Sequence, residues 1–129
     1  MIFLDSSFFI AMMFPEDKNH IRSLELYHFL KHENGIINNT VLVEVLNTIS
    51  RYNSRINPTS LYETLMENYF IDYLQAENYN KAFNKFDHYN YSINYSNCTI
   101  LETMENNDVN KIVTFDPDFK KVDGLIVIE

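Results

Sequence analysis

Short apolar segments alternate with longer segments of helical spacing along this chain, and that alternation most limits its possible folds. Buried strands are expected at 2–4, 35–38, 111–115 and 125–128, with a shorter, less regular strand within 69–74. The intervening segments predict helices over 8–14, from Pro15 through 21–30, over 41–51, from 57–59 onward, and over 77–89 and 96–106.

Strands that alternate with helices predict an α/β fold, because parallel strands need long crossover connections. We therefore expect a mostly parallel sheet with helices on both faces. No repeat, linker or composition shift divides the sequence, so residues 1–129 are expected to form one domain. In such sheets ligands bind beyond the carboxyl ends of the strands, which directs attention to the residues that follow each strand.

Charge and cysteine content restrict the class of protein. Ten basic and 18 acidic residues give a formal net charge of -8, which argues against unspecific adhesion to nucleic acid but not against a nuclease that binds RNA through cations. Cys98 is the sole cysteine, so a reducing compartment is expected. The apolar run 8–14 is too short to cross a bilayer, and Asp5 interrupts any secretory segment. We expect a cytoplasmic protein without membrane contact.

Several acidic residues stand where they could support chemistry, and each also has a plain structural interpretation. Asp5 ends the first strand but could equally cap the following helix. Glu44 lies within an apolar helical stretch, where it is either solvated or needs a partner, a cation or a wet cleft. Asp116 and Asp118 follow the strand 111–115, although an Asp-Pro-Asp turn has the same appearance without chemistry. Individually these alternatives stay open.

Together the acids are more informative, because two strand ends and an early helix can converge on one edge of a sheet. Carboxylates that lie close together repel one another and favour a hard divalent cation. Magnesium is held by one or two carboxylates while it keeps waters and substrate phosphate, so such a site can activate water and bind a phosphodiester oxygen. Phosphodiester hydrolysis is the reaction class that this pattern indicates.

Sequence stretches in chain order also resemble a known family. They are the strand that ends in Asp5-Ser6, the stretch 40–47, the stretch 95–99, and the stretch 114–119, which reads Thr-Phe-Asp-Pro-Asp-Phe. In order and spacing the chain resembles a PIN domain of the VapC-like type over essentially its whole length. The final stretch is the most specific part of this resemblance.

The resemblance implies a Rossmann-like three-layer α/β/α PIN fold and Mg²⁺- or Mn²⁺-dependent endoribonuclease activity, often as the toxin of a toxin–antitoxin pair. It also implies a homodimer, an RNA substrate and an antitoxin segment laid across the cleft. By position, the catalytic and metal-binding acids are Asp5, Glu44 and Asp116. The supporting residues implied in the same way are Ser6, Asn47, Thr114 and Asp118.

The chain departs from the family pattern at Asn97, which stands where the family usually has a further acid. An amide oxygen can coordinate a cation but brings no charge, so Asn97 is still a candidate metal ligand and a weaker one. The alternative function is therefore a catalytically weakened or inactive PIN-fold module that binds RNA or protein. A phosphoacceptor receiver-like domain is disfavoured, because Glu44 lies inside a helix and no lysine ends a strand opposite Asp5.

Other polar residues have a purely structural interpretation beside a functional one. Cys98 has no histidine in its motif and is expected in the core. His28 and His32 share a helical face but lack a third metal ligand, so we place them on the surface. Basic residues that could steer a phosphate backbone, or simply be solvated, are Arg22, Arg51, Arg55, Lys120 and Lys121. Tyrosines that could stack unpaired bases, or simply pack, are Tyr89, Tyr91 and Tyr95.

Overall fold

A computed structural model describes residues 1–52 and 55–129 of the chain. Within these residues the chain forms six α-helices, five strands and one 3-10 helix. In chain order they are β1 (Ile2–Leu4), α1 (Ser6–Met13), α2 (His20–Leu30), β2 (Gly35–Asn38), α3 (Asn39–Arg51), α4 (Pro58–Asn68), β3 (Phe70–Asp72), α5 (Ala76–His88), α6 (Tyr95–Asn106), β4 (Lys111–Val113), η1 (Pro117–Lys121) and β5 (Ile126–Ile128).

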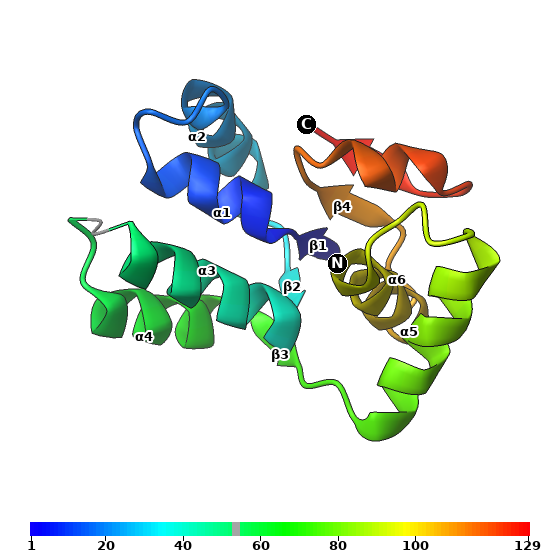
Figure 1. Ribbon diagram of the computed structural model, residues 1–129. Coiled ribbons are helices and arrows are strands. Elements are labelled where there is room, and N and C mark those ends of the chain that lie inside the picture. The colour runs from blue at the N-terminus through cyan, green and yellow to red at the C-terminus, as the bar shows by residue number, and fades with distance from the viewer. Residues whose placement is uncertain (53–54) are drawn as a thin grey trace.

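The strands form one parallel sheet in the order β3-β2-β1-β4-β5. Helices α1 to α4 lie on one side of this sheet and α5 and α6 on the other (Figure 1). The connections from β1 to β2 and from β2 to β3 cross the sheet in one direction, and the connection from β3 to β4 crosses it in the other. Because such connections are right-handed, their helices lie on opposite faces. The α/β fold with a parallel sheet and helices on both faces is therefore confirmed.

The strand order reverses at β1, because β2 lies beside it on one edge and β4 on the other. Phe3 and Leu4 of β1 pair in register with Ile112 and Val113 of β4. The chain segments that leave these two strands consequently emerge side by side at the carboxyl edge. Such a switch point is where open parallel sheets form a crevice for ligands.

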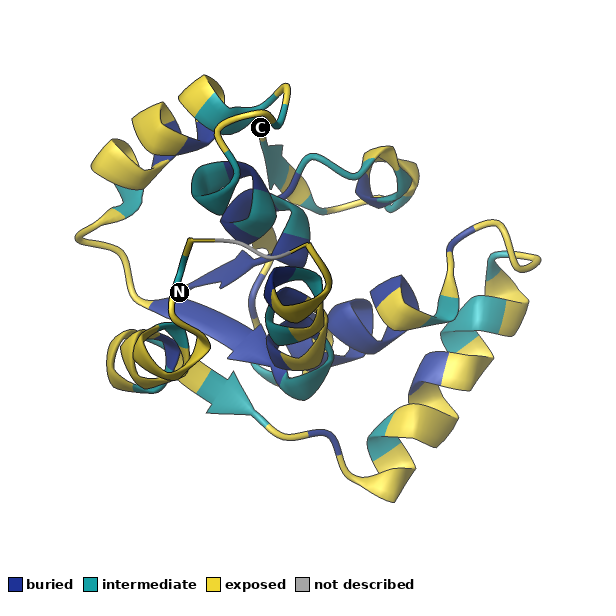
Figure 2. Cartoon of the chain, turned by 60° about the vertical axis from the view of Figure 1, so that its left-hand side comes forward, coloured by how far each residue is buried: buried dark blue, intermediate teal, exposed yellow. Residues whose placement is uncertain are grey.

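The core fills both faces of the central strands. Phe3, Ile36 and Ile112 are completely buried, as expected for strands covered on two sides. Figure 2 shows the buried residues concentrated in the sheet and the helices next to it, whereas α5 exposes most of its outer surface. Gly35 allows the Tyr69 ring to pack closely against the backbone of β2, since a Cβ at residue 35 would lie 2.7 Å from Cδ1 of Tyr69.

Element boundaries differ from the sequence expectation for local reasons. Helix α1 begins at Ser6 and not at residue 8, because Asp5 caps its first turn. Helix α2 begins at His20, since Asp17 and its neighbours form a turn after Pro15. Strand β4 is shorter than 111–115, and the segment after Asp116 is a 3-10 helix instead of a simple turn. No helix in the described ranges has the length and apolar character needed to traverse a bilayer.

Candidate functional site

A cleft of about 850 Å³ opens at the carboxyl edge of the sheet, where the strand order reverses. Its walls come from the start of α1, one face of α3, the start of α6, the connection before α2 and the segment after β4. The cleft brings together six of the residues singled out from the sequence: Asp5, Ser6, Glu44, Asn47, Asn97 and Asp116. Thr114 and Asp118 lie behind this lining and contact it through hydrogen bonds.

Asp5 is the most deeply buried acid of the cleft, with 4% of its surface exposed. Its Oδ1 accepts the backbone N–H of Ser6 at 2.8 Å, which caps α1, and its Oδ2 accepts the Thr114 hydroxyl at 2.6 Å. Burial raises the pKa of Asp5, the hydrogen bonds lower it, and the negative charge of Asp116 raises it further. The net result is a raised pKa. Asp5 is thus both a helix cap and a carboxyl group whose charged form is unfavourable without a positive partner.

Ser7 completes the support of Asp5, and the sequence interpretation missed it by favouring Ser6. The Ser7 hydroxyl lies 2.9 Å from Asp5 Oδ2 and also accepts the backbone N–H of Phe115 at 3.0 Å, so it ties α1 to the segment after β4. Ser6 reaches Asp5 with its hydroxyl only at 3.4 Å. The sequence Asp-Ser-Ser did contain a signal for Ser7. It offers a second hydroxyl at the start of a helix, where one side chain can bond both the capping residue and the end of a neighbouring strand.

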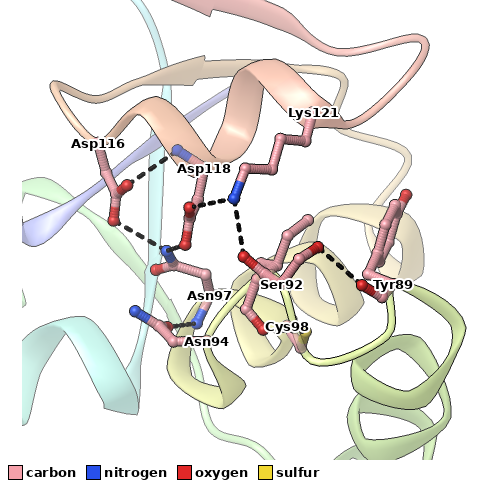
Figure 3. Close-up of polar contacts among 9 residues, drawn as sticks. Tyr89, Ser92, Asn94, Asn97, Cys98, Asp116, Asp118 and Lys121 are labelled. Carbon is pink, nitrogen blue, oxygen red and sulfur yellow. Dashed lines mark hydrogen bonds and ion pairs between the residues drawn. The ribbon is translucent and has the colours of Figure 1, made fainter.

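Asp116 and Asn97 face each other across the cleft floor (Figure 3). The Asn97 amide Nδ2 donates to Asp116 Oδ2 at 2.9 Å and to Asp118 Oδ2 at 3.4 Å. Asp116 Oδ1 accepts the backbone N–H of Asp118 at 2.9 Å, which starts η1. Asn97 is itself placed by Asn94, whose side chain caps α6 and accepts the Asn97 N–H at 2.8 Å. The amide N–H groups therefore hold the two acids together by hydrogen bonds without adding a positive charge.

Lys121 supplies a positive charge behind Asn97. Its ammonium group donates to Asp118 Oδ1 at 3.0 Å and to the carbonyl oxygen of Ser92 at 2.8 Å, as Figure 3 shows. Burial works to raise the pKa of Asp118, but hydrogen bonds from Lys121 and other donors outweigh it, so this pKa lies below its ordinary value. Asp118 therefore stays charged and keeps the Asn97 amide oriented with its nitrogen toward the acids.

Glu44 and Asn47 occupy the wall formed by α3. Both are exposed side chains on the cleft face of a helix whose opposite face, with Val41, Val45 and Ile49, is buried. This arrangement resolves the alternatives for Glu44: it is solvated, and the solvent that reaches it fills the cleft. Asn38 anchors this helix, because its buried side chain caps α3 and bonds α6.

The oxygen ligands of the cleft suit a small, hard cation that needs only one or two carboxylates. No three or more His, Cys, Asp and Glu side chains in residues 1–52 and 55–129 are grouped closely enough to hold a metal ion by themselves. Asp5 and Asp116 nevertheless interact through their charges, and Asn97 adds an amide beside them. Magnesium needs only one or two carboxylates when waters and substrate phosphate complete its shell, so these residues fit such an ion.

Arg51 also lines the cleft, and the remaining candidates lie outside it. Cys98 is fully buried, and burial raises the pKa of its thiol, which confirms a core role. His28 and His32 are exposed. Tyr91 and Tyr95 pack edge-on or tilted against Phe86, with ring centroids 4.8 Å and 5.7 Å away. The tyrosine that lines the cleft is another one, Tyr79, whose hydroxyl accepts a hydrogen bond from Asn39.

Comparisons with known proteins agree with this geometry. Residues 2–125 match the family model described as PIN domain. No curated protein is similar enough to match the chain. Among solved structures, the chain is similar to the sarcin-ricin loop cleaving toxin VapC20 of Mycobacterium tuberculosis, with 18% identity, a TM-score of 0.83 and coverage of 94% of each chain.

Two complexes provide further structural neighbours. A chain of the toxin–antitoxin complex from Klebsiella pneumoniae has 15% identity and a TM-score of 0.71, with coverage of 100% of this chain and 97% of that one. A chain of VapBC2 from Rickettsia felis, bound to a promoter DNA fragment, has 18% identity and a TM-score of 0.69, with coverage of 99% and 98%. These likenesses show a common fold.

Proposed function

The chain belongs to the PIN domain family, and from that premise we propose that it is a metal-dependent endoribonuclease, acting as the toxin of a toxin–antitoxin pair. The observation that carries the proposal is the convergence of Asp5, Glu44, Asn97 and Asp116 on one cleft at the switch point of the sheet. Converging oxygen ligands with a buried, charge-coupled carboxyl pair are typical of metal-assisted phosphodiester hydrolysis.

Asp5 and Asp116 would hold Mg²⁺ or Mn²⁺, and the side-chain oxygen of Asn97 would join them only after its amide turns over, because its nitrogen now faces Asp116. The bound cation would polarise a phosphodiester oxygen and lower the pKa of a water so that it can attack. The protein contributes a fixed set of ligands, because Thr114 and Ser7 hold the Asp5 carboxylate and η1 holds Asp116. Preorganised ligands of this kind need little rearrangement when the substrate arrives.

Glu44 would serve proton transfer. Its carboxylate is exposed within the cleft and makes no hydrogen bond or ion pair with other parts of the chain that the structure describes. It is therefore free to accept a proton from the attacking water at a carboxylate oxygen. Asn47, one turn further along α3, lines the same wall and can donate its amide N–H groups to the substrate.

A second candidate function rests on Asn97. Because Asn97 is neutral, the site holds less negative charge than three or four acids would provide. Its amide nitrogen already donates a hydrogen bond to Asp116. Weakened metal binding would leave a module that binds RNA or protein and cleaves slowly or not at all. An antitoxin partner belongs to the same proposal and is supported by the structural likeness to chains from toxin–antitoxin complexes. A homodimeric state and a cytoplasmic location are proposed with it.

Incubation of the purified protein with an RNA pool, with Mg²⁺ or Mn²⁺ and with a chelator, tests the proposal. We expect metal-dependent cleavage that Asp5→Asn and Glu44→Gln abolish and Asn97→Asp increases. Glu105→Gln, on the exposed surface of α6, removes the same charge outside the cleft and should leave cleavage unchanged. Cleavage in Asn97→Asp alone would favour the weakened module, and silence in every variant would overturn the ribonuclease.

A further inference from the structure

One face of α3 runs the length of the cleft. Glu44, Asn47, Thr48 and Arg51 all line it, and their spacing of three, four and seven residues places them on the same side of the helix. Arg51 lies about 10 Å along the helix axis from Glu44, because each residue advances the helix by about 1.5 Å. A polar strip therefore extends along α3 from Glu44, in the proposed catalytic centre, to Arg51.

Arg51 is the basic side chain of the cleft wall, and it lacks an internal partner. Among the residues that line the cleft in the described ranges it is the only lysine or arginine, beside four acids. Its exposed guanidinium makes no ion pair or hydrogen bond within residues 1–52 and 55–129. Arg22 and Lys121, by contrast, are bound to carboxylates of the chain.

An unpaired guanidinium in an acidic cleft is suited to a ligand that brings its own negative charge. Lining acids repel a polyanion, so a strand that reaches them needs compensation close by. Arginine presents its donors in a planar fork that matches a phosphate, and the planarity limits the entropy lost on binding. Neither core packing nor an internal salt bridge accounts for Arg51, since it is exposed and unpaired within the described part of the chain.

We propose that Arg51 binds a backbone phosphate of the RNA strand on one side of the cleaved bond, and that the strand lies along α3 from Glu44 toward Arg51. This inference rests on the proposed ribonuclease function. It makes Arg51 a substrate-binding residue and assigns it no part in the chemical step. Such a contact positions the strand without reading its sequence.

The salt dependence of RNA binding tests this assignment. A fluorescently labelled single-stranded RNA is titrated with protein in Mg²⁺, between about 50 and 200 mM salt, with every protein carrying Asp5→Asn so that the RNA stays intact. Arg51→Gln should weaken binding about tenfold, as loss of one charge-assisted contact does. It should also reduce the slope of log K against log salt by about 0.7, the value for one phosphate on a single strand.

Matched variants separate a contact from a general change of charge. Lys111→Gln removes one positive charge at the start of β4, which is the opposite edge of the sheet, and should leave the slope near that of the parent. Arg51→Lys should keep most of the slope, because the charge remains. With Asp5 intact, Arg51→Gln should raise KM for cleavage with little change in kcat. Thermal melting verifies that each variant is folded.

The outcomes distinguish the two proposals. Equal slopes for Arg51→Gln and Lys111→Gln overturn the phosphate contact, whether or not the wild type cleaves RNA. A fall in kcat at constant KM overturns it as well, since it would place Arg51 in the chemical step. Absence of cleavage by the wild type, together with the expected loss of slope, keeps the Arg51 contact and removes the ribonuclease function.

Discussion

Replacement of Asn97 by aspartate should destabilise the metal-free protein and make its stability depend on metal. The amide nitrogen now donates to Asp116 at 2.9 Å and to Asp118 at 3.4 Å. A carboxylate in its place would face both acids, and two unit charges about 4 Å apart repel by about 4 kcal/mol at an effective dielectric constant of about 20. Protonation limits this cost, because neutralising a carboxyl of ordinary pKa at pH 7 takes about 4 kcal/mol.

We therefore expect Asn97→Asp to lower the free energy of unfolding by about 2–4 kcal/mol at pH 7 in a chelator, which lowers Tm by roughly 10 °C. The penalty should shrink by up to about 1.4 kcal/mol for each pH unit of acidification, since the new carboxyl is protonated more readily in the folded state. Mg²⁺ or Mn²⁺ should raise Tm of the variant more than that of the wild type, because the cation binds only the folded site.

Asn57→Asp is the matched control for this experiment. It introduces the same charge at the exposed N-cap of α4, outside the cleft, where aspartate caps as well as asparagine does. Its Tm should change by only a few degrees in chelator and should not gain a metal dependence. An Asn97→Asp variant that melts with the wild type in chelator at pH 7, or that metal does not stabilise further, would refute the reasoning.

Three further perturbations test the remaining parts of the site and the fold. Asp5→Asn should raise Tm at neutral pH in chelator. Because the pKa of Asp5 is raised in the folded protein, its charged form lowers the stability when the pH lies above the ordinary pKa of 3.8, and this penalty disappears at lower pH. A Tm gain that persists unchanged at low pH would contradict this. Thr114→Val should cost about 1–3 kcal/mol by removing the 2.6 Å hydrogen bond to Asp5. It should also move the acid limb of the pH–cleavage profile to higher pH, whereas Thr114→Ser should restore it. Gly35→Ala should cost about 1–3 kcal/mol in chemical denaturation, because its Cβ would meet the Tyr69 ring at 2.7 Å; cleavage per folded molecule should not change.

The fold was predictable because its information is local. Short apolar segments buried on both faces, such as Ile2–Leu4, cannot be satisfied outside a covered parallel sheet. The exact ends of elements were less accessible, since they depend on contacts between distant segments. Residue 114, expected inside a strand, instead supports Asp5, which follows β1, and donates its backbone N–H to Ile128 of β5.

The residues of the cleft were accessible from the sequence, but their interactions were not. Asp5, Glu44 and Asp116 could be selected because each follows a strand or interrupts an apolar helix, whereas Asn97 was indicated only by the resemblance to the family. The preference of Asp5 for Ser7 over Ser6 depends on which hydroxyl faces the segment after β4, which is a tertiary property. The amide orientation of Asn97 is likewise set by Asp118 and Lys121, from a segment that the sequence indicated only as a turn.

The dual duty of two acids affects how relatives of this chain should be interpreted. Asp5 and Asp116 each start a helix with a side-chain oxygen, so the fold itself confines these positions to capping residues such as aspartate and asparagine, whether or not a reaction depends on them. Glu44 holds nothing together in the described ranges, and its loss would cost the folded state almost nothing. A chain released from catalysis would therefore drift first at Glu44, which makes that position the more sensitive indicator of whether activity is still under selection.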